Sequence, residues 1–114
     1  MENPKRGEIA LDIGGETYNC KITMDVIMRI ETSLGKGILK VAQGLQEADI
    51  SATEMVAFLT PVLRSGGRDL KEKDVGELIW KAGFAEGLKA LAEVIAFVIS
   101  GGDSEEGNEL KAAG

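Results

Sequence analysis

The chain has 114 residues, the size of one domain, and its 44% hydrophobic content excludes a wholly disordered protein. Its 13 basic and 19 acidic residues give a net charge of −6, which argues against binding to nucleic acid or to an anionic membrane surface. Aromatic residues make up only 4%, so the core must come from Leu, Ile, Val, Ala and Met, which suits packed helices.

The first part of the chain predicts a β-hairpin. Residues 8–13 and 17–23 both alternate between apolar and polar positions, as half-buried strands do. The apolar positions are Ile9, Leu11 and Ile13 in the first strand and Tyr18, Cys20 and Ile22 in the second. Between them, Gly14 and Gly15 supply the positive φ of a tight turn. An isolated hairpin is marginal in water, so we expect its apolar face to rest on helices.

Five helices are predicted after the hairpin, over residues 24–34, 36–46, 52–65, 70–82 and 84–100. Thr23 or Asp25 can cap the first helix, and Gly35 can end it in a left-handed conformation. The third helix has the clearest start, because Ser51 and Glu54 form a capping box.

The fourth helix has a less distinct beginning. Asp69 stands three residues before Glu72, and this spacing makes Asp69 a possible cap. Gly83 separates this helix from the last one.

The last helix is the most apolar segment, and we expect the rest of the fold to be organised around it. One stripe recurs at helical spacing and contains Phe84, Leu88, Leu91, Ile95 and Val98. Val94 and Phe97 fall outside the stripe and need cover that it does not provide. The segment spans 17 residues with three charges, which is too short and too polar for a transmembrane span.

These patterns together predict an α+β fold that is mostly α, with an N-terminal β-hairpin packed on a bundle of about five helices. We expect one domain over residues 1–100. Residues 101–114 are small and acidic, and we expect them to form a disordered tail.

No catalytic constellation is apparent. The chain has no histidine, which removes the commonest acid–base group and transition-metal ligand. Cys20, the single cysteine, lies on the apolar face of a predicted strand, where packing is the simpler role. No intrachain disulfide can form, which fits a reducing compartment. We therefore expect no catalytic residue, no cofactor and no metal site.

Five residues are candidates for partner binding: Trp80, Val94, Phe97, Arg64 and Arg68. Trp80 lies off the buried stripe of its helix, so it either covers the fold or faces a partner. The segment from Arg64 to Arg68 is a basic, glycine-rich loop that could hold an anion, although a helix cap and turn is the favoured explanation.

The methionines leave a similar choice. Met24, Met28 and Met55 fit an ordinary core, or they adapt to an irregular partner surface.

Several short motifs occur in a recognisable order. They are Asn3-Pro4-x-Arg6-Gly7-Glu8, Gly15-x-x-Tyr18, Glu31-x-x-Leu34-Gly35, Leu63-Arg64-x-Gly66-Gly67, and Val75 spaced from Gly83. This order, over about residues 3–100, resembles the tail assembly chaperone family of phages and gene transfer agents, whose members are also described as tail-tube-like proteins.

The resemblance implies a non-enzymatic protein of the bacterial cytoplasm, encoded by a prophage or gene transfer agent. Its implied partners are the tape measure protein and the tail tube protein, and homo-oligomerisation is left open. The alternative is a structural, tube-associated component of a phage-like particle. A tube subunit would close rings through extended β-sheet, whereas this chain offers one hairpin, which favours the chaperone.

Overall fold

The protein is described by a computed structural model that defines residues 6–102. Its elements are β1 (Glu8–Ile13), β2 (Glu16–Lys21), α1 (Met24–Leu34), α2 (Ile38–Gln46), α3 (Ala52–Arg64), α4 (Glu72–Ala82) and α5 (Phe84–Ile99). The predicted α+β class is confirmed, with a two-stranded antiparallel hairpin and five helices in the described part of the chain. The predicted acidic tail lies outside the described residues beyond Gly102.

The hairpin pairs its strands without a bulge, from Glu8 opposite Lys21 to Ile13 opposite Glu16. Gly14 and Gly15 form the turn at φ values of 63° and 85°, as the sequence predicts. The inner face is closed by the buried side chains of Leu11, Ile13, Tyr18 and Cys20. The second strand ends at Lys21, two residues before the predicted boundary.

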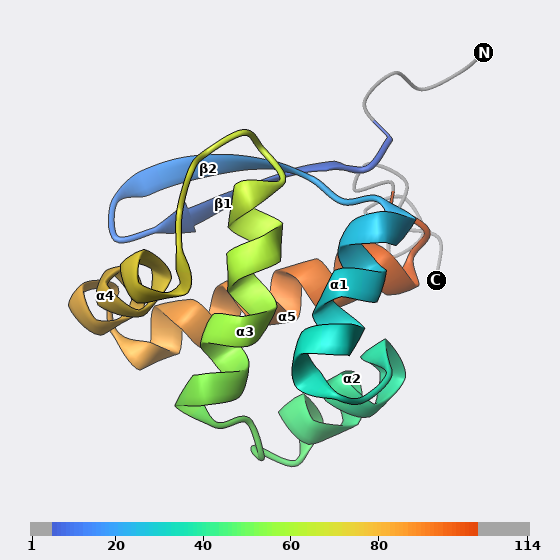
Figure 1. Ribbon diagram of the computed structural model, residues 1–114. Helices are drawn as coiled ribbons and strands as arrows, with labels where there is room; N and C mark the ends of the chain where they lie inside the picture. Colours follow the sequence, from blue (N-terminus) through green and yellow to red (C-terminus); the bar gives the residue numbers. More distant parts are fainter. Residues whose placement is uncertain (1–5, 103–114) are drawn as a thin grey trace, which may run out of the picture.

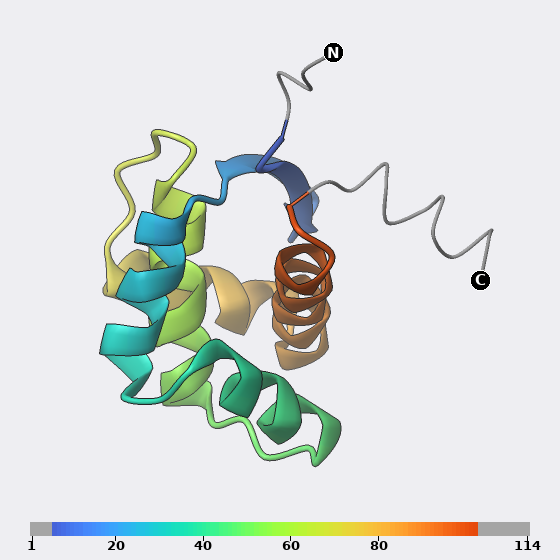
Figure 2. The same ribbon diagram turned by 90° about the vertical axis from the view of Figure 1, so that its right-hand side faces the viewer.

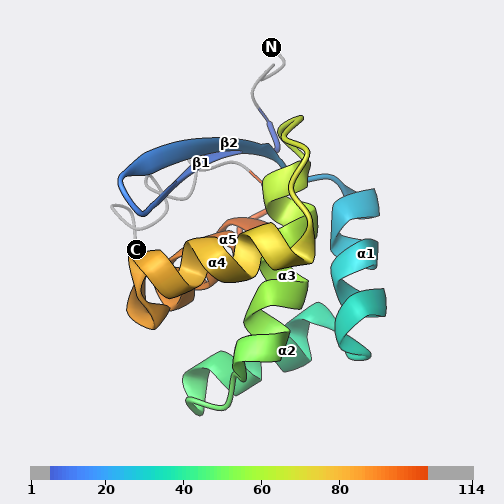
Figure 3. The same cartoon turned by 60° about the vertical axis from the view of Figure 1, so that its left-hand side comes forward.

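Two helices occupy the centre of the molecule. Helix α5 runs beneath the hairpin, and α3 crosses α5 (Figures 1 and 2). Helix α3 contacts α1, α4, α5 and β2, while α5 contacts β1, α2, α3 and α4. Helix α4 packs on the side of α3 opposite α1 (Figure 3). Each central helix carries six buried residues, so α5 shares with α3 the organising role that the sequence assigns to it alone.

Local signals explain where most helices begin and end. The Thr23 hydroxyl accepts the N–H of Val26 at the start of α1, and Gly35 ends that helix at φ 73°. The capping box predicted at Ser51 and Glu54 is present, with bonds of 3.0 and 3.1 Å.

Helix α2 begins at Ile38, two residues later than predicted. The reason is a long-range cap, because the Glu31 carboxylate of α1 accepts the N–H of Ile38 at 2.9 Å. A carboxylate from another helix gives no signal in the local sequence.

The predicted cap of α4 is wrong. The N-cap residue is Lys71, whose N–H donates to the Asp74 carboxylate at 2.9 Å. Since α4 starts only at Glu72, Asp69 lies two residues ahead of the capping position and cannot reach the first turn.

Two glycines permit close approach between elements. A Cβ atom on Gly66 would overlap the carbonyl oxygen of Asn19, so the α3–α4 loop can lie directly against β2. A Cβ atom on Gly87 would overlap the sulfur of Met55 where α5 crosses α3. Through these two contacts the hairpin and the two central helices pack closely into one core.

No helix within residues 6–102 is both long enough and apolar enough to span a lipid bilayer.

Candidate partner-binding surfaces

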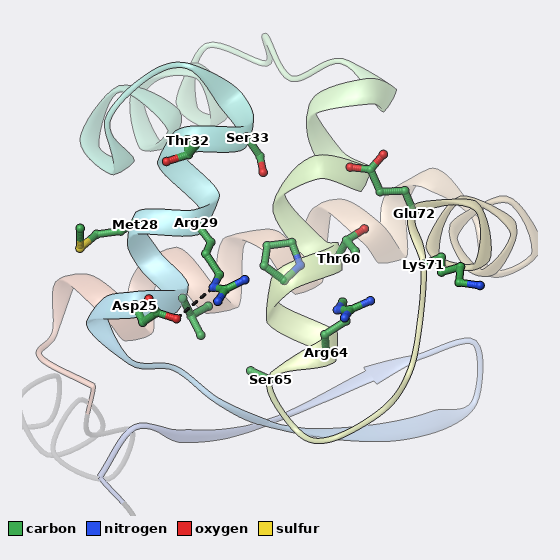
Figure 4. A pocket seen from close by; sticks show the side chains of 12 residues that line it. Asp25, Met28, Arg29, Thr32, Ser33, Thr60, Arg64, Ser65, Lys71 and Glu72 are labelled. Carbon is green, nitrogen blue, oxygen red and sulfur yellow. Dashed lines mark hydrogen bonds and ion pairs between the residues drawn. The ribbon is translucent and has the colours of Figure 1, made fainter.

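A groove of about 850 Å³ runs between α1, α3 and the start of α4 (Figure 4). Its lining includes the buried residue Val26, Pro61 and several hydroxyl-bearing residues. The remaining lining residues are Asp25, Met28, Arg29, Thr32, Ser33, Thr60, Arg64, Ser65, Lys71 and Glu72. The groove thus combines apolar and polar side chains from three helices.

The groove is mildly basic on an acidic protein. Three cations, Arg29, Arg64 and Lys71, face two carboxylates, Asp25 and Glu72. Arg29 is held by Asp25 at 2.9 Å, one helical turn away, in an ion pair that is exposed and so contributes little to stability. The Arg64 guanidinium donates to the carbonyl of Leu70 at 2.9 Å. Arg64 therefore closes the α3–α4 loop while its side chain borders the groove.

Arg68 lies away from this groove. Its guanidinium donates to the Glu16 carboxylate at 2.8 Å and to the Thr17 carbonyl at 3.3 Å. It also covers the Tyr18 ring, 4.4 Å from the ring centroid, in a cation–π contact. Arg64 and Arg68 thus point to different elements, and Arg68 fastens the loop to the hairpin.

Among residues 6–102, Trp80 is the most exposed large hydrophobic residue, with 86% of its surface accessible. It projects from α4 on the side away from the buried residues Val75 and Ile79. Phe84, just beyond the break at Gly83, is 44% exposed. An indole with no cover from the described chain is typical of residues at protein interfaces.

Val94 and Phe97 require a correction. Their relative exposures are 0% and 4%, so the chain itself covers them. The hairpin lies over α5 and widens its buried face beyond the predicted stripe, whereas Phe84, which the stripe includes, is exposed. In this fold the two side chains are core residues and lie out of reach of a partner.

Four further hydrophobic residues are exposed. The sequence left Met24 and Met28 open between the core and a partner surface, and it gave no indication for Leu39 and Ile99. Met24 and Met28 are 67% and 56% exposed, and Leu39 and Ile99 are exposed as well. Met28 lines the groove, whereas Met55 belongs to the core. A signal for the first two existed: they lie one turn apart and outside the stripe formed by Val26 and Ile30.

The titratable groups show no arrangement for chemistry. Burial raises the pKa of the Cys20 thiol to about 11, against a smaller opposing effect of Arg68, so the thiol is protonated and inert. Within the described residues, no group of acidic or cysteine side chains could hold a metal ion. What the molecule presents to its surroundings is a groove and several exposed apolar side chains.

The fold defines the class: a small, mostly helical α+β domain with an N-terminal hairpin packed on its helices. Comparison with known families places it further: residues 6–101 match the family described as "Phage tail tube protein, GTA-gp10". Because the match spans most of the chain, the protein belongs to this family of phage and gene-transfer-agent tail proteins. Neither the curated proteins nor the solved structures gave a match.

The family is one of structural tail proteins and is not known for catalysis, which agrees with the lack of a catalytic constellation in the sequence. Its description implies other tail proteins as partners.

Proposed function

We propose that this protein is a tail assembly chaperone that binds the tape measure protein and helps to recruit tail tube subunits around it. It acts by binding alone, as a single domain over residues 1–100, in the cytoplasm of a bacterial host whose prophage or gene transfer agent encodes it. Family membership supports a role in tail assembly. The single observation that carries the binding role is the 86% exposure of Trp80.

The binding face includes Trp80 and the groove bordered by Arg64. A long helical client exposes apolar side chains before assembly, and the exposed indole of Trp80 offers them an anchor. The groove adds hydroxyl groups and cations that can pair with polar groups of the client. Arg68 contributes indirectly, because it holds the α3–α4 loop against β2.

Co-expression with the tape measure protein encoded in the same tail gene cluster tests this proposal. The tape measure protein should co-purify with the wild type and remain soluble. Trp80→Ala should weaken binding by about 2 kcal/mol, or roughly thirtyfold in Kd. Leu39→Ala is the matched control, since Leu39 is an exposed hydrophobic residue on α2. Failure of the folded wild type to bind the tape measure protein would overturn the proposal.

A second candidate is a structural component of the tail, because the family is described as a tail tube protein. Mass spectrometry of purified particles distinguishes the two functions. A structural component is present at many copies per particle, whereas an assembly chaperone is absent from the finished particle.

A further inference from the structure

The two edges of the hairpin differ in how far the rest of the fold covers them. Along β2, the N–H of Lys21 donates to the Ser65 hydroxyl at 2.9 Å, and the carbonyl of Thr17 accepts from Arg68. Between them, Gly66 lies directly against the carbonyl of Asn19. The α3–α4 loop therefore covers the outer edge of β2.

These bonds also fix the direction of the backbone groups on β1. Thr17, Asn19 and Lys21 turn their polar backbone groups away from β1, and they lie opposite Asp12, Ala10 and Glu8. Opposite residues of an antiparallel pair either bond to each other or both face outward. The N–H and C=O groups of Glu8, Ala10 and Asp12 must therefore point to the outer edge of β1.

That outer edge is unpaired within residues 6–102, where no backbone group bonds to Glu8, Ala10 or Asp12. All three residues are exposed. The pairing of β1 with β2 has no bulge, and β1 contains no proline, so two of the usual devices against a further strand are missing.

The charges beside this edge are mostly negative. Helix α5 follows β1 from the bond between Glu86 and Gly14 at one end to the bond between Gly7 and Gly102 at the other (Figure 1). Glu93 lies two turns along the same face of α5 as Glu86 and is exposed. With Glu8 and Asp12 on β1, the two elements carry four exposed carboxylates. The cations near them are Lys89, the one cation among the exposed α5 residues described, and Lys21, which lies opposite Glu8 on β2.

We propose that the outer edge of β1 binds an extended segment of a partner protein as a third strand, and that this segment carries Lys or Arg at two positions four residues apart. The backbone groups at Glu8, Ala10 and Asp12 supply main-chain hydrogen bonds. Side chains four apart on the incoming strand lie opposite Glu8 and Asp12, which share the outer face of the hairpin. This site is separate from Trp80 and does not depend on the proposed chaperone function.

A second copy of the chain is a poor occupant. Antiparallel pairing of two β1 strands through the outward-facing residues, centred on Ala10, places Glu8 of each copy opposite Asp12 of the other. Like charges directly opposite each other are destabilising. The charges at the edge thus select a basic segment over self-association.

Fluorescence anisotropy with a labelled peptide tests the site in the full chain. The peptide alternates Thr and Val and carries two lysines four residues apart; a matched peptide carries glutamates instead, and a third has N-methyl groups on the amides that would pair with β1. The lysine peptide should bind, and the other two should bind at least about tenfold more weakly. Equal binding of all three peptides, or no binding of the lysine peptide, would overturn the proposal.

Variants of Ala10 give the complementary test on the protein. Ala10→Pro removes an outward N–H without removing a bond to β2, and proline is tolerated on edge strands. Ala10→Pro should weaken binding of the lysine peptide at least about tenfold. Ala10→Thr, which keeps the N–H, should bind this peptide within about twofold of the wild type. If Ala10→Pro fails to fold, the N-methylated peptide still decides the question. Concentration-dependent dimerisation that Ala10→Pro abolishes would overturn the proposal in favour of self-pairing.

Discussion

The Oε1 atom of Glu86 accepts a hydrogen bond from the backbone N–H of Gly14 at 2.8 Å. The two residues are 72 positions apart, and their bond joins the hairpin turn to the first turn of α5. A turn amide that would otherwise face water is thus used to set the position of the hairpin on the helix.

Glu86→Ala should lower the free energy of unfolding by about 1 kcal/mol, because it removes a hydrogen bond to a charged but exposed acceptor. Glu86→Gln should lose less, since its amide oxygen can still accept. Urea denaturation measures both changes. Glu93→Ala, an exposed change two turns further along α5, should stay within about 0.5 kcal/mol of the wild type; an equal loss there would show that the bond to Gly14 is not responsible.

Two glycine-to-alanine substitutions should have opposite effects. Gly66→Ala places a Cβ atom on the carbonyl oxygen of Asn19, so the loop must move from β2, at a cost of about 2–3 kcal/mol. Gly76→Ala adds a methyl group 3.9 Å from Val56 inside α4, which is ordinary contact, and should stabilise the helix by up to about 1 kcal/mol. Denaturant midpoints compare the two. A neutral Gly66→Ala would show that β2 and the loop are not in close contact.

The pH dependence of stability should report on Glu54. Its pKa is lowered, first by the hydrogen bond with Lys36 and then by the bond from the backbone N–H of Ser51. A lowered folded-state pKa means that the carboxylate stabilises the fold above its unfolded pKa of about 4.5, and that this contribution is lost as the pH falls through the lower folded value.

Glu54→Gln should therefore flatten the loss of stability on acidification, and Lys36→Gln should make that loss smaller, because it removes the first cause of the lowered pKa. Unfolding midpoints measured across the acid range test both variants. If the stability of Glu54→Gln falls with pH in the same way as that of the wild type, other carboxylates cause the acid-induced loss of stability.

Much of the fold follows from local sequence signals. Gly14-Gly15, Gly35 and the capping box at Ser51 each act within a few residues, and the structure has the turn, the helix end and the helix start that they predict. The class and the order of the elements follow from these signals together with apolar periodicity.

What the sequence could not provide depends on distant partners. The start of α2 depends on Glu31 of another helix, and the burial of Val94 and Phe97 depends on the elements packed against α5. The groove beside Arg64 arises only when α1 and α3 are packed together. Trp80, by contrast, was recognisable as a candidate because its position relative to Val75 and Ile79 is a local property of one helix.

The buried thiol should react slowly with Ellman's reagent. Burial raises the pKa of Cys20 from 9.0 to about 11, which lowers the thiolate fraction at neutral pH by about a hundredfold, and its 2% exposure limits access further. Reaction in native buffer should be at least about a hundredfold slower than in denaturing urea. Comparable rates in the two conditions would place Cys20 on the surface.

Trp80 is the single tryptophan and so provides a direct optical test of its own position. Its 86% exposure predicts an emission maximum close to that of a free indole in water, efficient quenching by acrylamide, and little spectral change on unfolding. If Trp80 anchors a client, addition of the tape measure protein should shift the emission to shorter wavelength and protect the indole from acrylamide, because contact removes it from water. A blue-shifted, protected indole in the free monomeric protein would instead place Trp80 in the core. Tight client binding without any change in its emission would move the client surface elsewhere, with the groove beside Arg64 as the next region to mutate.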